Sequence, residues 1–208
     1  MTLGRSTVCI VDYEAGNLTS VRLALDKLGW DTVMSGKPEK VLGADRVIFP
    51  GVGAAPSAME NLQETGLSSA LLEYARSGRP MLGICLGAQI IFEHSAEGYT
   101  TCLGLLPGTV EPLNPGPDFK VPHMGWNTVD TVRGHPVWTD VEDGSQFYFV
   151  HGYAVDPAEE DVVIGRTDYD GLFVSAVARD NVLAFQFHPE RSGRFGLQVL
   201  DNFLRWSP

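Results

Sequence analysis

A reactive residue placed between a short apolar run and a helix-forming run is the feature that most constrains this fold. Residues 81–89 read Met-Leu-Gly-Ile-Cys-Leu-Gly-Ala-Gln, which predicts a strand, a sharp turn and a helix. Gly83 and Gly87 stand two residues before and after Cys85, the spacing of a nucleophile elbow with Cys in place of Ser. In so tight a turn a Cβ at either glycine would collide with the adjoining backbone. We therefore expect Cys85 to project from the end of a buried strand.

A thiol at that position has two chemical consequences. The unpaired N–H groups and the dipole of the new helix favour the thiolate, which is the nucleophilic form of cysteine. The N–H of Leu86 also points toward whatever Cys85 attacks, and supplies half of an oxyanion hole. The alternative is a buried free cysteine that packs as a small hydrophobic residue.

Composition and charge limit the class of protein. The chain has 208 residues, of which 44% are apolar and 20% charged, so we expect one globular domain spanning 1–208. Its formal net charge of -11 argues against nucleic-acid or anionic-membrane binding as the main activity. No apolar run approaches the roughly 20 residues that cross a membrane, and the N-terminus lacks the apolar core of a secretion signal.

Cysteine usage points to a reducing compartment. Cys9, Cys85 and Cys102 are an odd, widely spaced set without a C-x-x-C pair or a disulfide framework. We therefore expect a cytoplasmic protein.

Strand and helix patterns alternate over the first ninety residues. Apolar runs predict buried strands, and apolar residues recurring every three or four positions predict helices, the first of which Asn17 can cap. The expected strands are 8–11, 32–34, 46–49 and the run ending at Cys85; the expected helices are 18–28, 57–63 and 67–77. This order implies a parallel sheet with helices on both faces.

Beyond Gly98 the chain is rich in Pro, Gly and β-type runs. The expected strands are 108–113, 127–132, 147–155, 162–167, 173–178 and 182–187, and an amphipathic helix around 195–204 closes the chain. Strands that follow one another without helices indicate antiparallel pairing. The predicted fold is an α/β protein with an open, mostly parallel central sheet flanked by helices and with added antiparallel strands in the second half.

A Gly-rich turn, Pro50-Gly51-Val52-Gly53, directly follows the 46–49 strand. It lies at the end of a parallel sheet where ligands bind, and it can direct backbone N–H groups at an anion. A phosphate loop is a poor match, because Pro56 occupies the third position of G-x-G-x-x-G and no Gly-Lys-Ser/Thr follows. The alternative is a tight turn that binds nothing.

A histidine and a glutamate stand two residues apart in Phe185-Gln186-Phe187-His188-Pro189-Glu190. In extended chain such residues point the same way, so the Glu190 carboxylate can set the tautomer of His188. The other ring nitrogen is then free to act as a base toward a thiol. His-x-Glu alone is often a surface pair, but together with Cys85 it suggests a Cys-His-Glu triad. Zinc is disfavoured because no H-E-x-x-H or Cys/His cluster is present.

The Pro-Gly-x-Gly turn, the Gly-x-Cys-x-Gly elbow and the His-Pro-Glu run together resemble the class I glutamine amidotransferases, in the family's order and over most of the chain. That resemblance implies that L-glutamine is the substrate, with Cys85 as nucleophile, His188 as base and acid, and Glu190 orienting His188. It also implies functions for further residues. These are Val52 and Leu86 in the oxyanion hole, and Gly51, Gly53, Gln89, His151 and Gly152 in substrate binding. Neither a metal nor an organic cofactor is expected.

Within that class, several segments resemble the glutaminase subunits of imidazole glycerol phosphate synthase. They are Asp12-Tyr13 with Gly16-Asn17-Leu18, residues 121–127 (Val-Pro-His-Met-Gly-Trp-Asn), residues 147–151 (Phe-Tyr-Phe-Val-His) and residues 168–171 (Asp-Tyr-Asp-Gly). The alternative for the 121–127 run is a core Trp beside a β-turn. The resemblance implies a heterodimer with a (β/α)8 cyclase subunit, which Asn17, Trp126 and Arg191 would face. The cyclase would use the released ammonia to make imidazole glycerol phosphate and aminoimidazole carboxamide ribotide.

Three positions depart from the family pattern, and three other functions stay open. Glu14 replaces the usual Gly, Ala88 the usual Met, and Gly152 the usual Ser or Thr. The rivals are an amidotransferase of another pathway (pyridoxal phosphate, guanylate or anthranilate), a non-catalytic module that retains the fold, and a cysteine hydrolase acting on peptides or γ-glutamyl conjugates. Only the 121–127 run argues against the first. The intact Cys85, His188 and Glu190 argue against the second.

Overall fold

Five parallel strands form the centre of the molecule, and the chain reaches each through a helix or a longer connection. The computed structural model describes residues 7–14 and 18–208. The parallel strands are β1 (Val8–Val11), β2 (Thr32–Ser35), β3 (Arg46–Gly51), β4 (Met81–Cys85) and β13 (Val182–Phe185). They lie in the order β2-β1-β3-β4-β13. The carboxyl ends of β4 and β13 are therefore neighbours, so that Cys85 and the chain leading to His188 lie at the same edge of the sheet.

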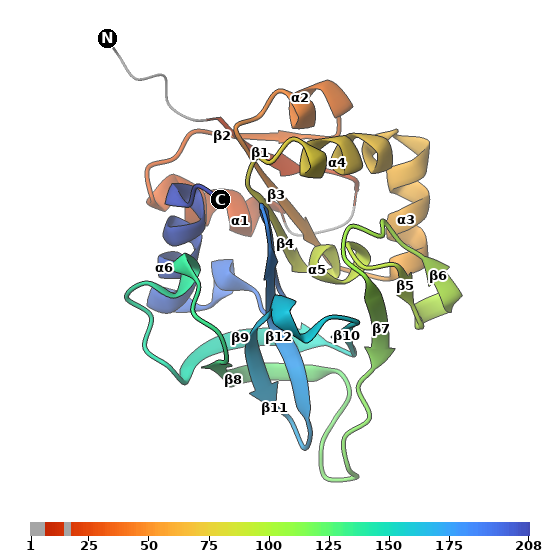
Figure 1. Cartoon of the computed structure of the whole chain (residues 1–208), viewed down its shortest axis with the longest axis vertical. Helices are drawn as coiled ribbons and strands as arrows, with labels where there is room; N and C mark the ends of the chain where they lie inside the picture. The colour runs from red at the N-terminus through yellow and green to blue at the C-terminus, as the bar shows by residue number, and fades with distance from the viewer. Residues whose placement is uncertain (1–6, 15–17) are drawn as a thin grey trace.

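Helices cover both faces of these strands (Figure 1). Alternate side chains of β1 enter different cores, Ile10 with α1 and α6 and Cys9 with α3 and α4, as the period-two geometry of a strand requires. The helices are α1 (Leu18–Lys27), α2 (Pro38–Leu42), α3 (Ala55–Glu64), α4 (Leu67–Arg76), α5 (Leu86–Ile90) and α6 (Gly193–Arg205). The predicted helices are confirmed, and α2 is an additional short one.

Mostly antiparallel strands extend the sheet beyond β13, and most of them lie in the lower part of Figure 1. The order continues β12-β10-β7-β5-β6, while β11 pairs with β12 and β8, and β8 pairs with β9. Their bounds are β5 (His94–Ser95), β6 (Thr100–Thr101), β7 (Gly108–Pro112), β8 (His123–Thr131), β9 (Ser145–His151), β10 (Tyr153–Pro157), β11 (Val163–Asp168) and β12 (Leu172–Arg179). Three 3-10 turns lie between these strands in the described part of the chain, η1 (Glu97–Tyr99), η2 (Pro136–Trp138) and η3 (Glu160–Val162), and a further one, η4 (Pro189–Arg191), follows β13. The predicted change from parallel to antiparallel strands is confirmed.

Several boundaries differ from those expected from the sequence, and for two of them the structure shows the reason. The run 147–155 is two strands, β9 and β10, which meet at Gly152 and pair with different neighbours. Helix α5 ends at Ile90 although the apolar run continues to Phe92. The carbonyls of residues 90–92 accept hydrogen bonds from the N–H groups of residues 103–105, and these bonds replace a further helical turn. An apolar run alone does not reveal such a competing partner.

Glu14, one of the departures from the family pattern, lies in a turn whose backbone conformation favours glycine. Glu14 adopts φ 65°, a left-handed conformation that favours glycine, and its N–H donates to Asp12 Oδ1 at 3.2 Å. The usual glycine of the family would adopt this turn without strain.

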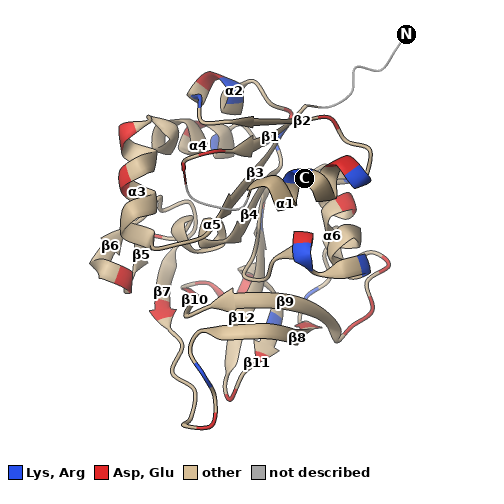
Figure 2. Ribbon diagram, turned by 180° about the vertical axis from the view of Figure 1, so that it is seen from behind, with Lys and Arg blue, Asp and Glu red and all other residues tan. Residues whose placement is uncertain are grey.

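Acidic side chains are spread over several helices and loops (Figure 2). Among the described residues, no helix has both the length and the apolar character needed to cross a membrane.

Candidate active site

Cys85 lies at the junction of β4 and α5 in a strained backbone conformation. Its φ of 54° and ψ of -109° fall outside the regions that L-residues ordinarily occupy, which costs of order 1–3 kcal/mol. A Cβ at Gly87 would collide with the carbonyl oxygen of Phe49, and one at Gly83 would lie 2.9 Å from the oxygen of Gly87. The structure therefore confirms the predicted elbow and the steric need for both glycines.

The thiol of Cys85 is nearly buried, with 6% of the residue exposed. Its Sγ donates to the carbonyl oxygen of Val150 at 3.8 Å and accepts a hydrogen bond from Nε2 of Gln186, also at 3.8 Å. Helix α5 has only five residues, so its dipole favours the thiolate less than a long helix would. The hydrogen bonds of the sulfur with Val150 and Gln186 are contacts that the Gly-x-Cys-x-Gly pattern does not indicate.

His188 and Glu190 form a buried pair at the end of β13. Nδ1 of His188 lies 2.8 Å from Oε1 of Glu190, and the two side chains are 6% and 5% exposed. Burial lowers the pKa of His188, but the hydrogen bonds and charges of Cys85 and Glu190 outweigh it, and the net pKa is raised. Nε2 of His188 is buried without a hydrogen-bond partner of normal geometry in the described structure. The carboxylate thus holds one ring nitrogen and leaves the other available near the thiol.

The pair is held by a 3-10 turn rather than by extended chain. Strand β13 ends at Phe185, and η4 spans Pro189–Arg191; the pairing predicted from extended geometry is present, but the turn produces it. The hydroxyl of Ser192 donates to the carbonyl oxygen of His188 at 2.6 Å and accepts from the N–H of Tyr148 at 2.9 Å. These bonds fix the turn against β9.

The Pro50–Gly53 turn lies beside the elbow. Gly51 pairs with Cys85 in the parallel register of β3 and β4. Val52 and Leu86 are therefore the residues that directly follow these two adjacent strands. Gly53 has φ 103°, and a Cβ on Gly51 would collide with the buried hydroxyl of Tyr13. The turn is therefore built for glycine, and it brings the two backbones that the sequence assigns to an oxyanion hole to the same edge.

The residues expected to bind substrate lie around the thiol with different exposure. Gln89 is 5% exposed, and its Nε2 donates to the carbonyl oxygen of Tyr153 at 2.9 Å and to Oε1 of Gln186 at 3.0 Å. Both amide hydrogens are thus used inside the protein, which leaves Oε1 for a ligand. A Cβ on Gly152 would lie 3.5 Å from Val121, an ordinary van der Waals contact, so glycine is not required at this position for lack of space around the Cβ.

His151 is buried, and both of its ring nitrogens are engaged. Nδ1 lies 2.8 Å from the carbonyl oxygen of Tyr153, and Nε2 lies 3.0 Å from Nδ1 of His123. Burial lowers the pKa of His151 to about 3 and that of His123 to about 4. Both rings are therefore neutral at physiological pH, and only the backbone of His151 is free to contact a substrate.

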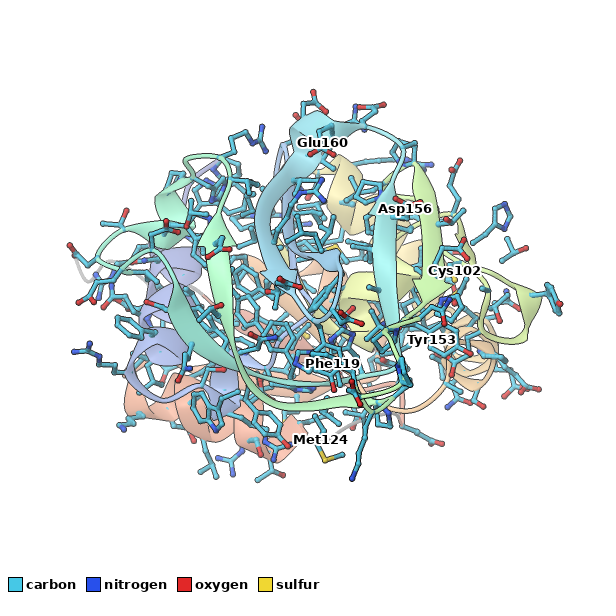
Figure 3. The ribbon with its side chains drawn as sticks, turned by 90° about the horizontal axis from the view of Figure 1, so that it is seen from below. Cys102, Phe119, Met124, Tyr153, Asp156 and Glu160 are labelled. Carbon is cyan, nitrogen blue, oxygen red and sulfur yellow. The ribbon has the colours of Figure 1, made fainter. Side chains whose placement is uncertain are left out.

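Trp126 and Arg191 meet on one exposed surface through Tyr148. The Arg191 guanidinium lies 4.0 Å from the centre of the Tyr148 ring, and Trp126 contacts the same ring edge-on at 6.2 Å. Trp126 is 53% exposed and Met124 63% exposed, and Figure 3 shows Met124 projecting outward from the ribbon. Asn17, the third residue expected on this surface, lies outside the described residues.

Within residues 7–14 and 18–208, no group of three or more His, Cys, Asp or Glu side chains could hold a metal ion. His94 is exposed, and His135 packs edge-on against Trp206 with ring centres 5.0 Å apart.

Sequence reasoning missed several residues around the thiol. Gln186 hydrogen-bonds to Cys85 and to Gln89, and the carbonyl oxygen of Tyr153 accepts a hydrogen bond from Gln89. His123 supports His151 from the neighbouring strand. A signal for Gln186 was present, because it precedes His188 by two residues and so shares its side of the chain. The contribution of Tyr153 could not be anticipated, since its backbone carbonyl, not its side chain, accepts the hydrogen bonds.

Comparisons with known proteins agree with this geometry. The family model described as glutamine amidotransferase class-I matches residues 9–206. The chain also resembles PurLQS from Thermotoga maritima, with a TM-score of 0.74, 19% identity, and coverage of 96% of this chain and 98% of the other. That likeness supports the fold. The chain belongs to the class I glutamine amidotransferase family.

Its curated relatives include imidazole glycerol phosphate synthase subunits HisH. The chain is 46% identical over 217 aligned positions to the HisH of Dechloromonas aromatica (strain RCB), covering 100% of both chains. It is 46% identical over 206 positions to that of Nitrosococcus oceani, covering 97% of this chain and 98% of the relative. With such identity over the full length, the chain falls within the HisH group of the family.

Proposed function

We propose that this chain hydrolyses L-glutamine to L-glutamate and ammonia through a thioester on Cys85, and that it supplies the ammonia to a (β/α)8 cyclase subunit of imidazole glycerol phosphate synthase. The observation that carries the proposal is that the strained Cys85 elbow and the His188–Glu190 pair lie at the ends of two adjacent parallel strands. In that pair, Nδ1 of His188 lies 2.8 Å from Oε1 of Glu190. The HisH relatives support the choice of partner. In this setting the pathway is histidine biosynthesis.

The first half of the reaction forms the thioester. Nε2 of His188 takes the proton of the Cys85 thiol as the sulfur attacks the side-chain amide carbon of glutamine, and the carbonyl oxygen becomes an oxyanion that the N–H groups of Val52 and Leu86 stabilise. The protonated His188 then gives its proton to the leaving nitrogen, which departs as ammonia. Glu190 holds the ring in the tautomer that presents Nε2 to the reaction and stabilises its charged form.

The second half returns the enzyme to its starting state. His188, now neutral, accepts a proton from water as the water attacks the thioester carbon. The second oxyanion collapses, the carbon–sulfur bond breaks, and glutamate leaves while Cys85 is restored. One imidazole serves both halves, so both depend on it.

Substrate binding rests on the residues that surround the thiol. Backbone groups of Gly51, Gly53, His151 and Gly152, with Oε1 of Gln89, are the groups available to hold the amino-acid end of glutamine. A single domain spanning 1–208 carries all of them, which the family match over residues 9–206 supports. The three free cysteines fit a cytoplasmic enzyme.

Replacing Cys85 tests the chemistry. Cys85→Ala should abolish glutamate release from L-glutamine, measured with a coupled glutamate assay, while the exposed control His94→Gln keeps wild-type turnover. Substantial turnover by Cys85→Ala would refute the thioester mechanism. Hydrolysis of peptides or γ-glutamyl conjugates in place of glutamine would support the cysteine hydrolase instead.

The partner proposal places Asn17, Trp126 and Arg191 in the interface with the cyclase. An exposed Trp and an Arg around one Tyr ring are side chains that often dominate binding energy. Trp126→Ala should weaken the complex at least tenfold by titration calorimetry, while Tyr99→Ala, an aromatic residue 98% exposed, should not. Equal affinity of the two variants would place the interface elsewhere, and capture of a different synthase would move the chain to another pathway.

A further inference from the structure

Gln186 is a buried polar side chain that contacts the reacting sulfur and that the triad does not use. It is 2% exposed, and its backbone N–H donates to the carbonyl oxygen of Ser175 at 2.9 Å. Its side-chain Nε2 donates to Sγ of Cys85 at 3.8 Å, within the longer range of hydrogen bonds to sulfur. A donor held this close to sulfur favours the charged thiolate over the neutral thiol.

The direction of this hydrogen bond is fixed by a neighbour. An amide has a donor at one end and an acceptor at the other, and Oε1 of Gln186 accepts from Nε2 of Gln89 at 3.0 Å. Nε2 of Gln89 also donates to the backbone carbonyl oxygen of Tyr153 at 2.9 Å. Because a carbonyl can only accept, the Tyr153 oxygen sets the orientation of Gln89. Gln89 in turn sets the orientation of Gln186, which leaves the N–H groups of Gln186 facing the sulfur.

The Tyr153 carbonyl also contacts the buried His151, which a second buried histidine, His123, supports in turn. Nδ1 of His151 lies 2.8 Å from that oxygen and therefore carries the proton, so Nε2 of His151 is an acceptor. Nδ1 of His123, 3.0 Å away, must then donate to it. Nε2 of His123 accepts from Nδ2 of Asn127 at 3.4 Å. Both rings are thus held as the Nδ1–H tautomer by an unbroken set of donors and acceptors.

We propose that Gln186 is a further catalytic residue for glutamine hydrolysis, whose amide N–H stabilises negative charge on the Cys85 sulfur, and that His151 and His123 are positioning residues that hold it there through Tyr153 and Gln89. This proposal rests on the proposed function for its substrate. The contact with the sulfur belongs to the chain itself.

The hydrogen bond acts wherever the sulfur carries charge. It favours the thiolate before attack on the amide carbon, and it weakens once the sulfur is acylated and neutral. When water has added to the thioester and the carbon–sulfur bond breaks, the electron pair returns to sulfur and the same N–H stabilises it as the leaving group. Gln186 gives up no proton and forms no covalent bond in either step.

The 121–127 run gains a second function from this network. His123 and Asn127 point into the chain of hydrogen bonds, whereas Met124 and Trp126, on the alternate positions of β8, are exposed. One strand therefore presents aromatic and apolar side chains outward and supports the nucleophile inward.

The test compares two replacements of Gln186. Gln186→Met removes the donor and the acceptor at similar volume. Gln186→Glu still accepts from Gln89 but cannot donate when ionised, and it places a negative charge beside the sulfur. The readout is the pH dependence of Cys85 alkylation by iodoacetamide, followed by mass spectrometry. Cys9 and Cys102 are replaced by Ser in every sample.

The pH at which alkylation of Cys85 reaches half of its maximal rate should rise by about one unit in Gln186→Met and by more in Gln186→Glu, since a hydrogen bond to a charged group is worth roughly a tenfold change. The titratable groups that face Cys85 are the Tyr13 hydroxyl and the His188 ring with Glu190 behind it. None of these three residues is replaced in the two Gln186 variants.

A matched control separates this effect from general damage to the core. Ser175→Ala alters the neighbouring buried residue, whose hydroxyl has no hydrogen-bond partner in the described part of the chain. It should keep the wild-type alkylation profile. Thermal unfolding of all variants shows whether each is folded. An unshifted profile in folded Gln186→Met would overturn the proposal, as would an equal shift in Ser175→Ala.

Two further readouts complete the experiment. In ¹⁵N-labelled protein, His123 and His151 should both show the Nδ1–H pattern, and an Nε2–H tautomer in either would overturn the positioning network. Turnover of glutamine should fall about tenfold in kcat for Gln186→Met with little change in KM. If the wild-type chain hydrolyses no glutamine, the proposed function fails, while the iodoacetamide profile still decides whether Gln186 stabilises the sulfur.

Discussion

Two pairs of buried side chains lie near Cys85, and they bear opposite electrostatic character. The His188–Glu190 turn follows the parallel strands, whereas the His151–His123 pair belongs to the antiparallel part. All four side chains are buried, yet the pKa of His188 is raised and those of His151 and His123 are lowered. The difference lies in the neighbours, because His188 faces a carboxylate and a thiol while His151 faces a neutral ring and a carbonyl.

Burial alone therefore does not distinguish a catalytic histidine from one that holds a fixed hydrogen bond. Burial without a charged neighbour keeps an imidazole neutral and makes it a fixed hydrogen-bonding group. Burial beside a carboxylate keeps a proton available near the reaction. The first arrangement suits positioning and the second suits proton transfer.

The largest effect expected from this comparison is the loss of the proton-transferring ring. His188→Asn should lower kcat by about a thousandfold, within the range for general acid–base catalysis, because both formation and hydrolysis of the thioester need it. Rapid-quench measurement with radiolabelled glutamine resolves the two steps. Accumulation of acyl-enzyme at an undiminished rate of acylation would contradict the prediction.

Removing only the charge of Glu190 should have a smaller effect. Glu190→Gln keeps the size of the side chain but removes the charge that supports protonation of His188, and turnover should fall about a hundredfold. The pKa of His188, followed by NMR, should fall at the same time. A lowered pKa with unchanged turnover would separate the pair from catalysis.

The buried histidines are also expected to affect the free energy of unfolding in opposite pH ranges, the neutral rings on the acid side and His188 on the alkaline side. The folded-state pKa values of His123 and His135 are lowered to about 4 and that of His151 to about 3, chiefly by burial. Below the ordinary histidine pKa of about 6.5 the unfolded chain binds protons that these rings do not, so stability falls toward acid. Each ring contributes up to about 1.4 kcal/mol per pH unit. The raised pKa of His188 adds to the free energy of unfolding at pH values below about 6.5. That contribution is lost progressively as the pH rises above 6.5 and through the pKa of His188 in the folded state.

Unfolding by urea from pH 4 to 9 tests both limbs. His123→Phe should flatten the acid limb by about one ring's slope and leave the alkaline limb unchanged, and His188→Asn should do the reverse. The exposed His94→Gln should alter neither. The assignment would be wrong if His123→Phe changed only the alkaline limb.

The smallest effect is expected at the outer end of the positioning network. Asn127→Ala removes the long 3.4 Å contact with His123 and the 2.8 Å bond to the carbonyl oxygen of Asp168. A neutral hydrogen bond is worth about 1 kcal/mol, so turnover should fall only about threefold. A loss as large as that of His188→Asn would mean that Asn127 takes part in the chemistry itself.

Local pattern was sufficient for the elbow and for the order of the elements. The glycines around Cys85, the alternation of strands and helices and the shift to β-type runs depend on neighbours close in sequence, and each was predicted. The length of α5 was not, because carbonyls of residues 90–92 bond to residues 103–105. The 3-10 turn at His188 was also missed, since Ser192 and Tyr148 together fix it.

The order of residues along the chain is enough to identify the groups that could react: a thiol between two glycines, an imidazole and a carboxylate two residues apart, and a Gly-rich turn. Steric exclusion and short-range spacing act within a few residues and can be read from the chain. Only the tertiary structure decided which end of Gln186 faces the sulfur and why His151 stays neutral. These depend on a backbone carbonyl and a second histidine from other strands, and hydrogen-bond direction is set by the three-dimensional neighbours of a group.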